Sequence, residues 1–410
     1  VHNSSVKESA AIPGDTATLV VSDVVYRGKG LGRLDGQVVF VPGVLPGETV
    51  EVRFTRRHKN YAEAGLIEVV SASPKRVAPA CPLVSVCPGC CYQHADYEEE
   101  LRLKQAQLAN LLERQAKVSS SVCLPPVPSP KPLGYRNRIS LHAAYDGSAA
   151  ALGYIGEDNE TVLDVPACPL AVAPLNERLA QLRADAGFMA TLRTHRSLTL
   201  RHTRHDGAIH FLGKAGAEKP WLTETTLFGQ VQVPRGSFFQ VNHGVADRLL
   251  AAVMAILKDT PCRAVADLYG GGGVFALAAG RAGVPRVIGI DSDEAAIQAA
   301  RQNARDHKLK NVEFVAQPAS KGLKQVFRRV DPAGVLLIVD PPRAGLEKPG
   351  IEAIGRSRPP EIVYVSCAAD TMVRDIALLA AAGYRVVSSQ LFDMFPRTPY
   401  FESLTRLTAG

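Results

Sequence analysis

The strongest limit on the fold is a regular alternation of apolar and helix-forming segments in the C-terminal part of the chain. From about residue 236, short apolar runs are each followed by a polar turn or a helical stretch, as in RAVADLYGGGG, RVIGIDSDEAAIQAARQNA, VLLIVDPPRAG and EIVYVSCAAD. Continuous apolar runs suit strands that are covered on both faces, and helices between them connect parallel neighbours. The pattern predicts a doubly wound, Rossmann-like α/β domain with a mostly parallel sheet over residues 236–410.

The first strand of this domain carries the elements of a cofactor site. AVADLYGGGG places Asp267 at a strand tip, followed by the glycines 270–273, which let a ligand approach the backbone closely. The next strand ends in Asp291, where a carboxylate can bind ribose hydroxyls. Phe275 stands where a dinucleotide motif has its third glycine, so S-adenosylmethionine is favoured over NAD. The alternative is a glycine-rich turn that binds nothing.

A later strand ends in Asp340, within VLLIVDPPRAG. Polar residues at the carboxyl ends of such strands line the ligand crevice, and the two prolines stiffen the loop. In amino-methylating enzymes a related loop ends in an aromatic residue that stacks on the base. Arg343 occupies that position here and counts against such an activity.

Cys367 and Glu402 suggest a reaction. Cys367 follows the apolar strand of VYVSCAAD, and Glu402 lies in the aromatic and proline-rich segment DMFPRTPYFESL. A lone cysteine at a strand end is commonly a packing residue, but burial raises the pKa of a carboxyl toward that of a usable base. A thiolate, a carboxylate and a methyl donor together indicate carbon methylation of a pyrimidine. Uracil C5 is a weak nucleophile until a thiolate adds at C6.

The rest of the 410-residue chain is long enough for one or two further domains. Short β-branched runs separated by glycine turns predict a small barrel over residues 12–72. This segment has a basic rim beside Tyr61, although charge alone favours a solvated hairpin end. The rim comprises Arg53, Arg56, Arg57, His58 and Lys59.

Residues 73–235 are expected to form a central α+β domain. We predict a helix at about 98–117 that packs on the catalytic domain, then a rigid proline-rich linker in VCLPPVPSPKP, and strands over 133–215. An Asp-Gly hairpin is predicted to carry a second basic surface, formed by Arg193, Arg196, Arg201 and Arg204.

Composition and cysteine usage indicate the compartment. The 47 basic residues against 40 acidic ones permit nucleic acid as a partner without demanding it. No apolar run approaches a membrane span of roughly 18 residues, and the first residues lack a signal-peptide pattern. We expect a soluble, cytoplasmic monomer with no membrane partner. Because cytoplasmic thiols stay reduced, the four cysteines of CPLVSVCPGCC, residues 81–91, indicate a metal site or catalysis.

The ordered motifs resemble those of the RNA uracil-5-methyltransferase family, in its iron–sulfur-containing 23S rRNA branch. YRGKGLGRLDGQVVFVPGVLPGE resembles the RNA-binding TRAM domain of these enzymes, and GYRNRISL resembles a motif of their central domain. SFFQVNHGV, DLYGGGGVF, DPPRAGL, VYVSCAADT and MFPRTPYFESL resemble their successive catalytic motifs. The resemblance spans nearly the whole chain.

The resemblance implies roles for individual residues. Cys367 would be the nucleophile and Glu402 the base that takes the C5 proton. Contacts to S-adenosylmethionine would come from Gln240, Tyr269 and Asp291, with Asp340 on the uracil or cofactor side of the pocket. The sequence departs from the family at Val274, at Pro318 and Ala319, and in SCAADT, so no cofactor contact is assigned to the first three positions.

The resemblance also implies a 4Fe-4S cluster on Cys81, Cys87, Cys90 and Cys168. Three close thiols and one remote thiol suit a cubane cluster, whereas zinc usually takes two close pairs. Zinc or no metal are the alternatives. Cys91 is expected to be a bystander, and Cys123 and Cys262 receive no role.

Several functions compete at this point. The main hypothesis is C5 methylation of a uridine in structured RNA, with 23S rRNA preferred because bacterial tRNA enzymes of the family typically lack the cluster. The same chemistry on tRNA is the alternative, as is a non-catalytic RNA-binding protein, which the presence of both Cys367 and Glu402 disfavours. An iron–sulfur redox protein would need a second electron carrier, and an amino-group methyltransferase would not need the thiol.

Overall fold

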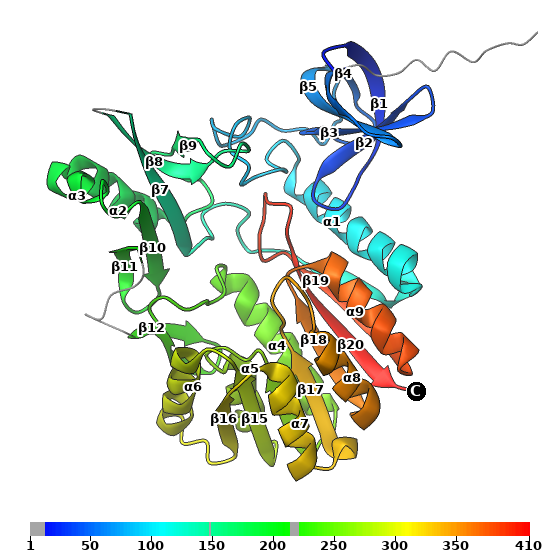
Figure 1. Ribbon diagram of the computed structural model, residues 1–410, viewed down its shortest axis with the longest axis vertical. Coiled ribbons are helices and arrows are strands. Elements are labelled where there is room, and N and C mark those ends of the chain that lie inside the picture. Colours follow the sequence, from blue (N-terminus) through cyan, green and yellow to red (C-terminus); the bar gives the residue numbers. More distant parts are fainter. Residues whose placement is uncertain (1–12, 147–148, 214–220) are drawn as a thin grey trace, which may run out of the picture. The chain divides into compact units, whose positions relative to one another are not determined.

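The computed structural model describes residues 13–146, 149–213 and 221–410 (Figure 1). The chain divides into two compact units, and each is described by itself. Unit 1 comprises the described residues up to Gln107 together with Arg397–Pro399, and unit 2 comprises the remainder. The predicted barrel domain was placed from residue 12, which lies outside the described residues. The three-domain division with boundaries at 72 and 235 stays a prediction.

Unit 1 begins with a closed five-stranded barrel in the order β1-β2-β3-β5-β4, which confirms the predicted small barrel (Figure 1, blue). Gly30 and Gly32 are required on β2, because a Cβ added to either would lie 2.2 Å from a Val44 methyl or 2.4 Å from a Leu19 methyl. Apolar side chains fill the interior by alternation along the strands, with breaks in β1 and β5 where the pairing register shifts. The strands are β1 Thr16–Val24, β2 Lys29–Leu34, β3 Gln37–Pro42, β4 Thr49–Arg57 and β5 Tyr61–Ser71.

The barrel continues into a loop and then α1, Tyr97–Leu111. Buried Glu48 ties the loop to the barrel, since its Oε2 accepts a hydrogen bond from Arg76 Nη2 at 2.6 Å and another from the Leu45 amide at 2.8 Å. These bonds outweigh burial and hold the pKa of Glu48 below its usual value. A π-helical turn at Leu112–Ala116 follows α1.

Unit 2 contains an eight-stranded sheet in the order β16-β15-β14-β17-β18-β20-β19-β6. The first five of these strands are parallel, and every residue of β14, β17 and β18 is buried, as expected for a sheet covered on both faces. The predicted methyltransferase-type α/β fold is thereby confirmed. The strands are β6 Cys123–Val127, β14 Ala264–Leu268, β15 Arg286–Asp291, β16 Val312–Ala316, β17 Val335–Val339, β18 Glu361–Ser366, β19 Tyr384–Phe392 and β20 Glu402–Ala409.

Helices connect these strands and bury their apolar stripes against the sheet. Asp293 caps α6, accepting hydrogen bonds from the Ala295 and Ala296 amides, and Asn242 caps α4. The helices are α4 His243–Asp259, α5 Val274–Arg281, α6 Glu294–Asp306, α7 Ala319–Arg329, α8 Lys348–Ser357 and α9 Ala369–Ala381, with 3-10 turns at Ser120–Val122 and Pro332–Gly334.

A second sheet of unit 2 is antiparallel and has the order β11-β10-β7-β8-β9, with β12 and β13 forming a separate hairpin. The predicted Asp-Gly hairpin is confirmed between β10 and β11, where Gly207 has a φ of 73°. The elements are β7 Arg138–Asp146, β8 Ala149–Ile155, β9 Val162–Asp164, α2 Ala173–Ala184, α3 Ala186–Thr191, β10 Ser197–Thr203, β11 Gly207–Leu212, β12 Trp221–Thr226 and β13 Gly229–Pro234.

The structure corrects the prediction for the proline-rich segment. Its first part is β6, an edge strand parallel to β19, with Cys123 opposite Ser389. Proline is tolerated there because an edge strand needs ladder bonds on one side alone. The proline-rich pattern, which predicts a linker, therefore includes a strand of the large sheet. Among the described residues, none of the helices has the length and apolar character needed to cross a bilayer.

Candidate active site

The predicted cofactor and catalytic residues of unit 2 meet at one edge of the large sheet. Asp291 ends β15, Tyr269 follows β14, Asp340 follows β17 and Cys367 follows β18. These four strands are adjacent and parallel, so their carboxyl ends lie side by side. Glu402 joins them from the opposite direction, because β20 runs antiparallel to β18 with Ser403 opposite Ser366.

The glycine loop after β14 has a backbone that few other residues could adopt. Gly273 has a φ of 82°, and a Cβ there would lie 2.6 Å from the Phe314 ring. Tyr269 also has a positive φ, of 61°, which turns the chain sharply at the strand end. The carboxylate of Asp291 accepts a hydrogen bond from the Gly271 amide at 2.9 Å and so ties the loop to the neighbouring strand.

A pocket of about 110 Å³ opens beside this loop. One of its walls carries an unsatisfied polar atom: Gln240 Oε1 is buried and has no hydrogen-bond partner among the described residues. An orphaned acceptor in a pocket lined by aromatic rings and bare glycine backbone fits a bound ligand with hydrogen-bond donors. The lining includes Thr225, Thr226, Phe238, Phe239, Gln240, His243, Tyr269, Gly270–Gly272, Val274, Phe275 and Asp340.

Two carboxyl groups at this edge, buried Asp267 and half-buried Asp340, have raised pKa values. Burial raises the pKa of Asp267 to about 8, although Asp267 also accepts a hydrogen bond from the Ala276 amide. Burial, reinforced by the charge of Asp291, raises the pKa of Asp340 to about 7. Each group can therefore carry a proton near neutral pH, which is a common property of functional sites.

The pKa values of Cys367 and Glu402 are both raised by burial and by the charge of Asp340. Burial raises the pKa of Cys367 to about 12, the charges of Glu402 and Asp340 add to this effect, and Arg343 opposes it. Glu402 is 2% exposed, and burial followed by the charge of Asp340 raises its pKa well above the usual value. Its Oε1 has no hydrogen-bond partner among the described residues. Burial thus disfavours the charged forms of both side chains, the Cys367 thiolate and the Glu402 carboxylate.

Arg343 is oriented by an aromatic ring. Its guanidinium lies 4.4 Å from the centroid of the Tyr400 ring, and Thr371 Oγ1 donates to its carbonyl oxygen at 3.0 Å. Tyr400 lies two residues before Glu402 in the sequence, so a side-chain contact joins the loop after β17 to the segment before β20.

Two arginines hold the segment that leads to Gln240, and the sequence pattern did not reveal them. Arg138 and Arg201 are partners across β7 and β10. Arg201 Nη1 donates to the carbonyls of Pro234, Arg235 and Ser237 at 3.2–3.3 Å. Arg138 Nη1 donates to the Ser237 carbonyl at 3.1 Å. Both guanidinium groups therefore fix the backbone just before Gln240, which lines the pocket beside the glycine loop.

This network corrects the predicted second basic surface. Arg193 and Arg196 are exposed as expected, but Arg201 is 2% exposed and bonds buried Glu224 at 3.1 Å. The other oxygen of Glu224 lies 3.0 Å from His243 Nε2, which in turn contacts Asn137 Nδ2 at 3.0 Å. The alternation of side chains along a strand does not show which face of the sheet other elements cover. The prediction that Arg201 lies on the surface was therefore wrong.

The cysteine-rich loop belongs to unit 1. Gln93 bridges two of its cysteines, because its Oε1 accepts from the Cys81 amide at 2.9 Å and its Nε2 donates to Cys90 Sγ at 3.3 Å. Cys87 lies on the same loop, and Cys168 lies in unit 2. Within the described ranges, no group of three or more His, Cys, Asp or Glu side chains is arranged to hold a metal ion.

A parallel sheet with a glycine loop, an orphaned acceptor and strand-end carboxylates defines a nucleoside-cofactor enzyme of the methyltransferase type. Comparison with known sequences narrows this class. The family model described as tRNA (uracil-5-)-methyltransferase matches residues 226–409, and the TRAM domain model matches residues 11–67.

Individual proteins resemble the whole chain. The 23S rRNA (uracil(1939)-C(5))-methyltransferase RlmD of Pectobacterium atrosepticum is 30% identical over 438 residues, covering 98% of this chain and 96% of the relative. An uncharacterised RNA methyltransferase of Thermosynechococcus vestitus is 29% identical, covering 97% and 99%. The crystal structure of the Pyrococcus abyssi tRNA (uracil-54, C5)-methyltransferase, in complex with S-adenosyl-L-homocysteine, matches with a TM-score of 0.72 and 28% identity, covering 95% and 99%. The chain belongs to the RNA uracil-5-methyltransferase family and is an RNA (uracil-5-)-methyltransferase with an N-terminal TRAM domain.

Proposed function

We propose that this enzyme methylates C5 of a uridine in 23S rRNA through a covalent bond between Cys367 and uracil C6. One observation carries the proposal: the antiparallel pairing of β18 and β20 brings Cys367 and Glu402 to the same sheet edge as Asp340 and the cofactor pocket. The rRNA target is supported by full-length similarity to RlmD proteins.

S-adenosylmethionine supplies an electrophilic methyl group when bound. Gln240, Tyr269, Asp291 and Asp340 would hold it, since all four lie at the pocket or at the adjoining strand ends. These residues suit the cofactor chemically, because the unpaired Gln240 oxygen can accept a hydrogen bond and Asp291 ends the strand at which a ribose diol is commonly bound.

Cys367 and Glu402 would carry out the bond changes at the uracil ring. The Cys367 sulfur bonds to C6 of the uracil and makes C5 nucleophilic, so that C5 can take the methyl group. Glu402 then removes the C5 proton, the bond between Cys367 and C6 breaks, and 5-methyluridine leaves. Because burial raises its pKa, the Glu402 carboxylate binds the C5 proton strongly once it has lost its own proton to solvent. In the free enzyme the Cys367 thiol is protonated, so its proton must pass to solvent before the sulfur attacks C6.

We also propose that Cys81, Cys87, Cys90 and Cys168 hold a 4Fe-4S cluster. Three thiols on one loop, two of them positioned by Gln93, are a donor set that suits such a cluster. Protein purified without oxygen should contain about four iron and four sulfide ions per chain. Cys168→Ala should lower this content, whereas Cys91→Ala should not. A colourless protein with one zinc ion would contradict the proposal.

The barrel of unit 1 would bind the RNA backbone. Its basic rim is exposed at Arg53, Arg56 and Arg57, and the His58 ring stacks on Tyr61 with centroids 4.2 Å apart. Guanidinium groups beside an aromatic pair suit a flexible RNA strand, while the target base is flipped into the pocket of unit 2.

Mapping 5-methyluridine in RNA from cells with and without the gene tests the function. Loss of one modified position in 23S rRNA is the expected result. Loss of the modification in tRNA would favour the second candidate, which the similarity to the Pyrococcus abyssi tRNA enzyme keeps open. Unchanged 5-methyluridine in both RNAs would reject the proposed function.

A further inference from the structure

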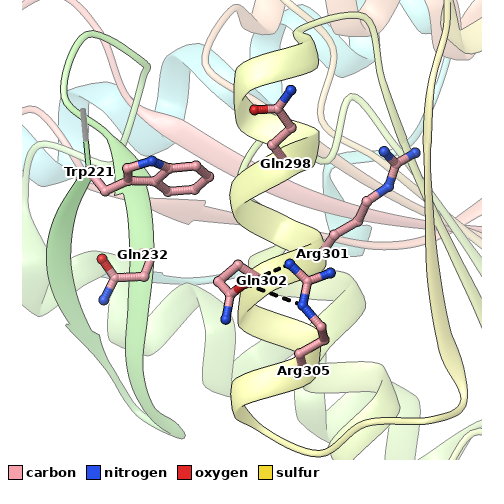
Figure 2. A pocket seen from close by; sticks show the side chains of 6 residues that line it. All are labelled: Trp221, Gln232, Gln298, Arg301, Gln302 and Arg305. Atoms are coloured by element: carbon pink, nitrogen blue, oxygen red, sulfur yellow. Dashed lines mark hydrogen bonds between the residues drawn. The ribbon is translucent and has the colours of Figure 1, made fainter. Parts of the chain in front are cut away.

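Unit 2 has a second pocket, between the β12–β13 hairpin and α6. It measures about 590 Å³ and shares no lining residue with the cofactor pocket. Figure 2 shows Trp221, the single tryptophan of the chain, reaching from the hairpin toward α6. The lining residues are Trp221, Gln232, Gln298, Arg301, Gln302 and Arg305.

The two walls of this pocket are fixed to each other. Buried Asn303 of α6 bonds both backbone groups of Gln232, accepting from its amide at 2.6 Å and donating to its carbonyl at 2.9 Å. Behind the pocket, Leu222, Val231 and Val233 of the hairpin are buried in the core of unit 2. A ligand would therefore meet a preformed site and would bear little cost for ordering it.

The α6 wall presents a row of hydrogen-bond donors. Its four lining residues are spaced three and four apart, which places them on one helix face. Gln302 Oε1 accepts from Nε and Nη2 of Arg305 at 3.2 and 2.6 Å, and the Phe314 carbonyl accepts from the same atoms of Arg301 at 3.1 and 2.8 Å. Both arginine side chains are exposed to solvent, and these hydrogen bonds fix the orientation of their guanidinium groups. None of the six lining residues described carries a carboxylate, and the nearest bonded one is Asp306, which accepts from Gln302 Nε2.

We propose that this pocket binds an unpaired nucleotide of the RNA substrate, outside the catalytic centre. A base would stack on the Trp221 ring, the arginines would contact the phosphates, and the glutamine amides would bond the edge of the base. This inference rests on the proposed function, because it assumes an RNA substrate. An acidic peptide would use the arginines and leave the indole face without a partner.

The bound nucleotide is distinct from the target uridine. β12 begins at Trp221, and Thr225 and Thr226 at its other end line the cofactor pocket. Four residues of extended strand separate the two sites by about 13 Å. The Trp221 pocket would thus hold a second nucleotide of the same RNA and help to select the sequence or loop around the target.

Tryptophan fluorescence tests this directly, since Trp221 is the single emitter of its kind in the chain. Titration of the full-length protein with single-stranded oligouridylate should quench the emission to saturation. The quenching midpoint should rise with salt, because phosphate contacts release counterions. A poly-glutamate peptide of equal charge should leave the emission unchanged. Absence of quenching by RNA, or equal quenching by the peptide, would overturn the proposal.

Variants supply the second measurement. Trp221→Ala should raise the KM for RNA about tenfold, with kcat and S-adenosylhomocysteine affinity unchanged, and Trp221→Phe should retain most of the affinity. Arg305→Ala should weaken RNA binding and lower the slope of log affinity against log salt by about one. Arg328→Ala, at an exposed arginine of α7, is the matched control and should match the wild type.

The outcomes separate this inference from the proposed function. An enzyme that forms 5-methyluridine with an unchanged KM in Trp221→Ala and Arg305→Ala would reject the pocket and keep the function. Oligouridylate quenching without 5-methyluridine in any RNA would reject the function and keep the pocket.

Discussion

Two sites of unit 2, the candidate active site at the strand ends and the pocket beside Trp221, differ in how far their polar side chains are exposed to water. At the sheet edge, Asp340, Cys367 and Glu402 are largely withdrawn from water, and burial raises the pKa of each. Beside Trp221, the arginines and glutamines are exposed or half-buried and form bonds to one another. Burial creates reactivity at the cost of stability, whereas exposure allows binding by many weak contacts. Single changes should therefore be severe at the first site and graded at the second.

The largest expected effect is that of Cys367→Ala. Loss of the sulfur should lower the methylation rate by about four orders of magnitude or more, because C5 is never activated. RNA binding should persist. 5-Fluorouridine RNA, which traps the wild type because fluorine cannot leave as a proton, should form no covalent adduct with this variant on a denaturing gel. An adduct formed by Cys367→Ala would show that another residue attacks.

Glu402→Gln should act at a later step and slow turnover by about a hundredfold to ten thousandfold. The thiol and the methyl donor remain, but the C5 proton has no base. A methylated, covalent protein–RNA complex should therefore accumulate and survive denaturing electrophoresis. Turnover of this variant at the wild-type rate would remove Glu402 from the mechanism.

The next effect in size concerns the buried hydrogen-bond network around Arg201, which contains none of the reacting atoms. Arg201→Met should lower the free energy of unfolding by about 3–5 kcal/mol, since it leaves Glu224 buried without its guanidinium partner. It should also weaken S-adenosylhomocysteine binding, because the backbone before Gln240 loses three hydrogen bonds. Arg201→Lys should restore part of both. Urea titration and calorimetry measure the two effects, and exposed Arg193→Met is the control.

The smallest effect concerns pH. The native pKa of Asp267 is about 8 against an ordinary value of 3.8, so the folded protein holds a proton that the unfolded chain has lost. Its contribution to stability is complete below pH 3.8 and is lost as pH rises toward 8, at up to about 1.4 kcal/mol per pH unit. Asp267→Asn should flatten this slope in thermal unfolding of the ligand-free protein, and exposed Asp259→Asn should not. An unchanged slope in Asp267→Asn would place the titrating group elsewhere.

The sequence allowed prediction of the features that depend on local pattern. The barrel follows from β-branched alternation with glycines where strands approach closely, and the sheet edge follows from polar residues after buried strands. Features that depend on distant partners were not predictable. Arg201 is buried because Glu224, on another strand, faces it, and Cys123 begins a strand because β19 offers an open edge. The indole of Trp221 needed the position of α6 before it could be assigned to a pocket.

The short return of the chain into unit 1 has a consequence for synthesis on the ribosome. The Arg397 carbonyl accepts from the Cys91 and Tyr92 amides at 2.9 and 3.2 Å, and its own amide donates to Glu100 at 2.6 Å. Unit 1 therefore includes residues that are translated long after α1, with a delay of roughly tens of seconds at ordinary elongation rates. Until then the cysteine loop lacks these contacts. Truncation before residue 397 would leave the first-made unit incomplete, although its barrel strands are already present.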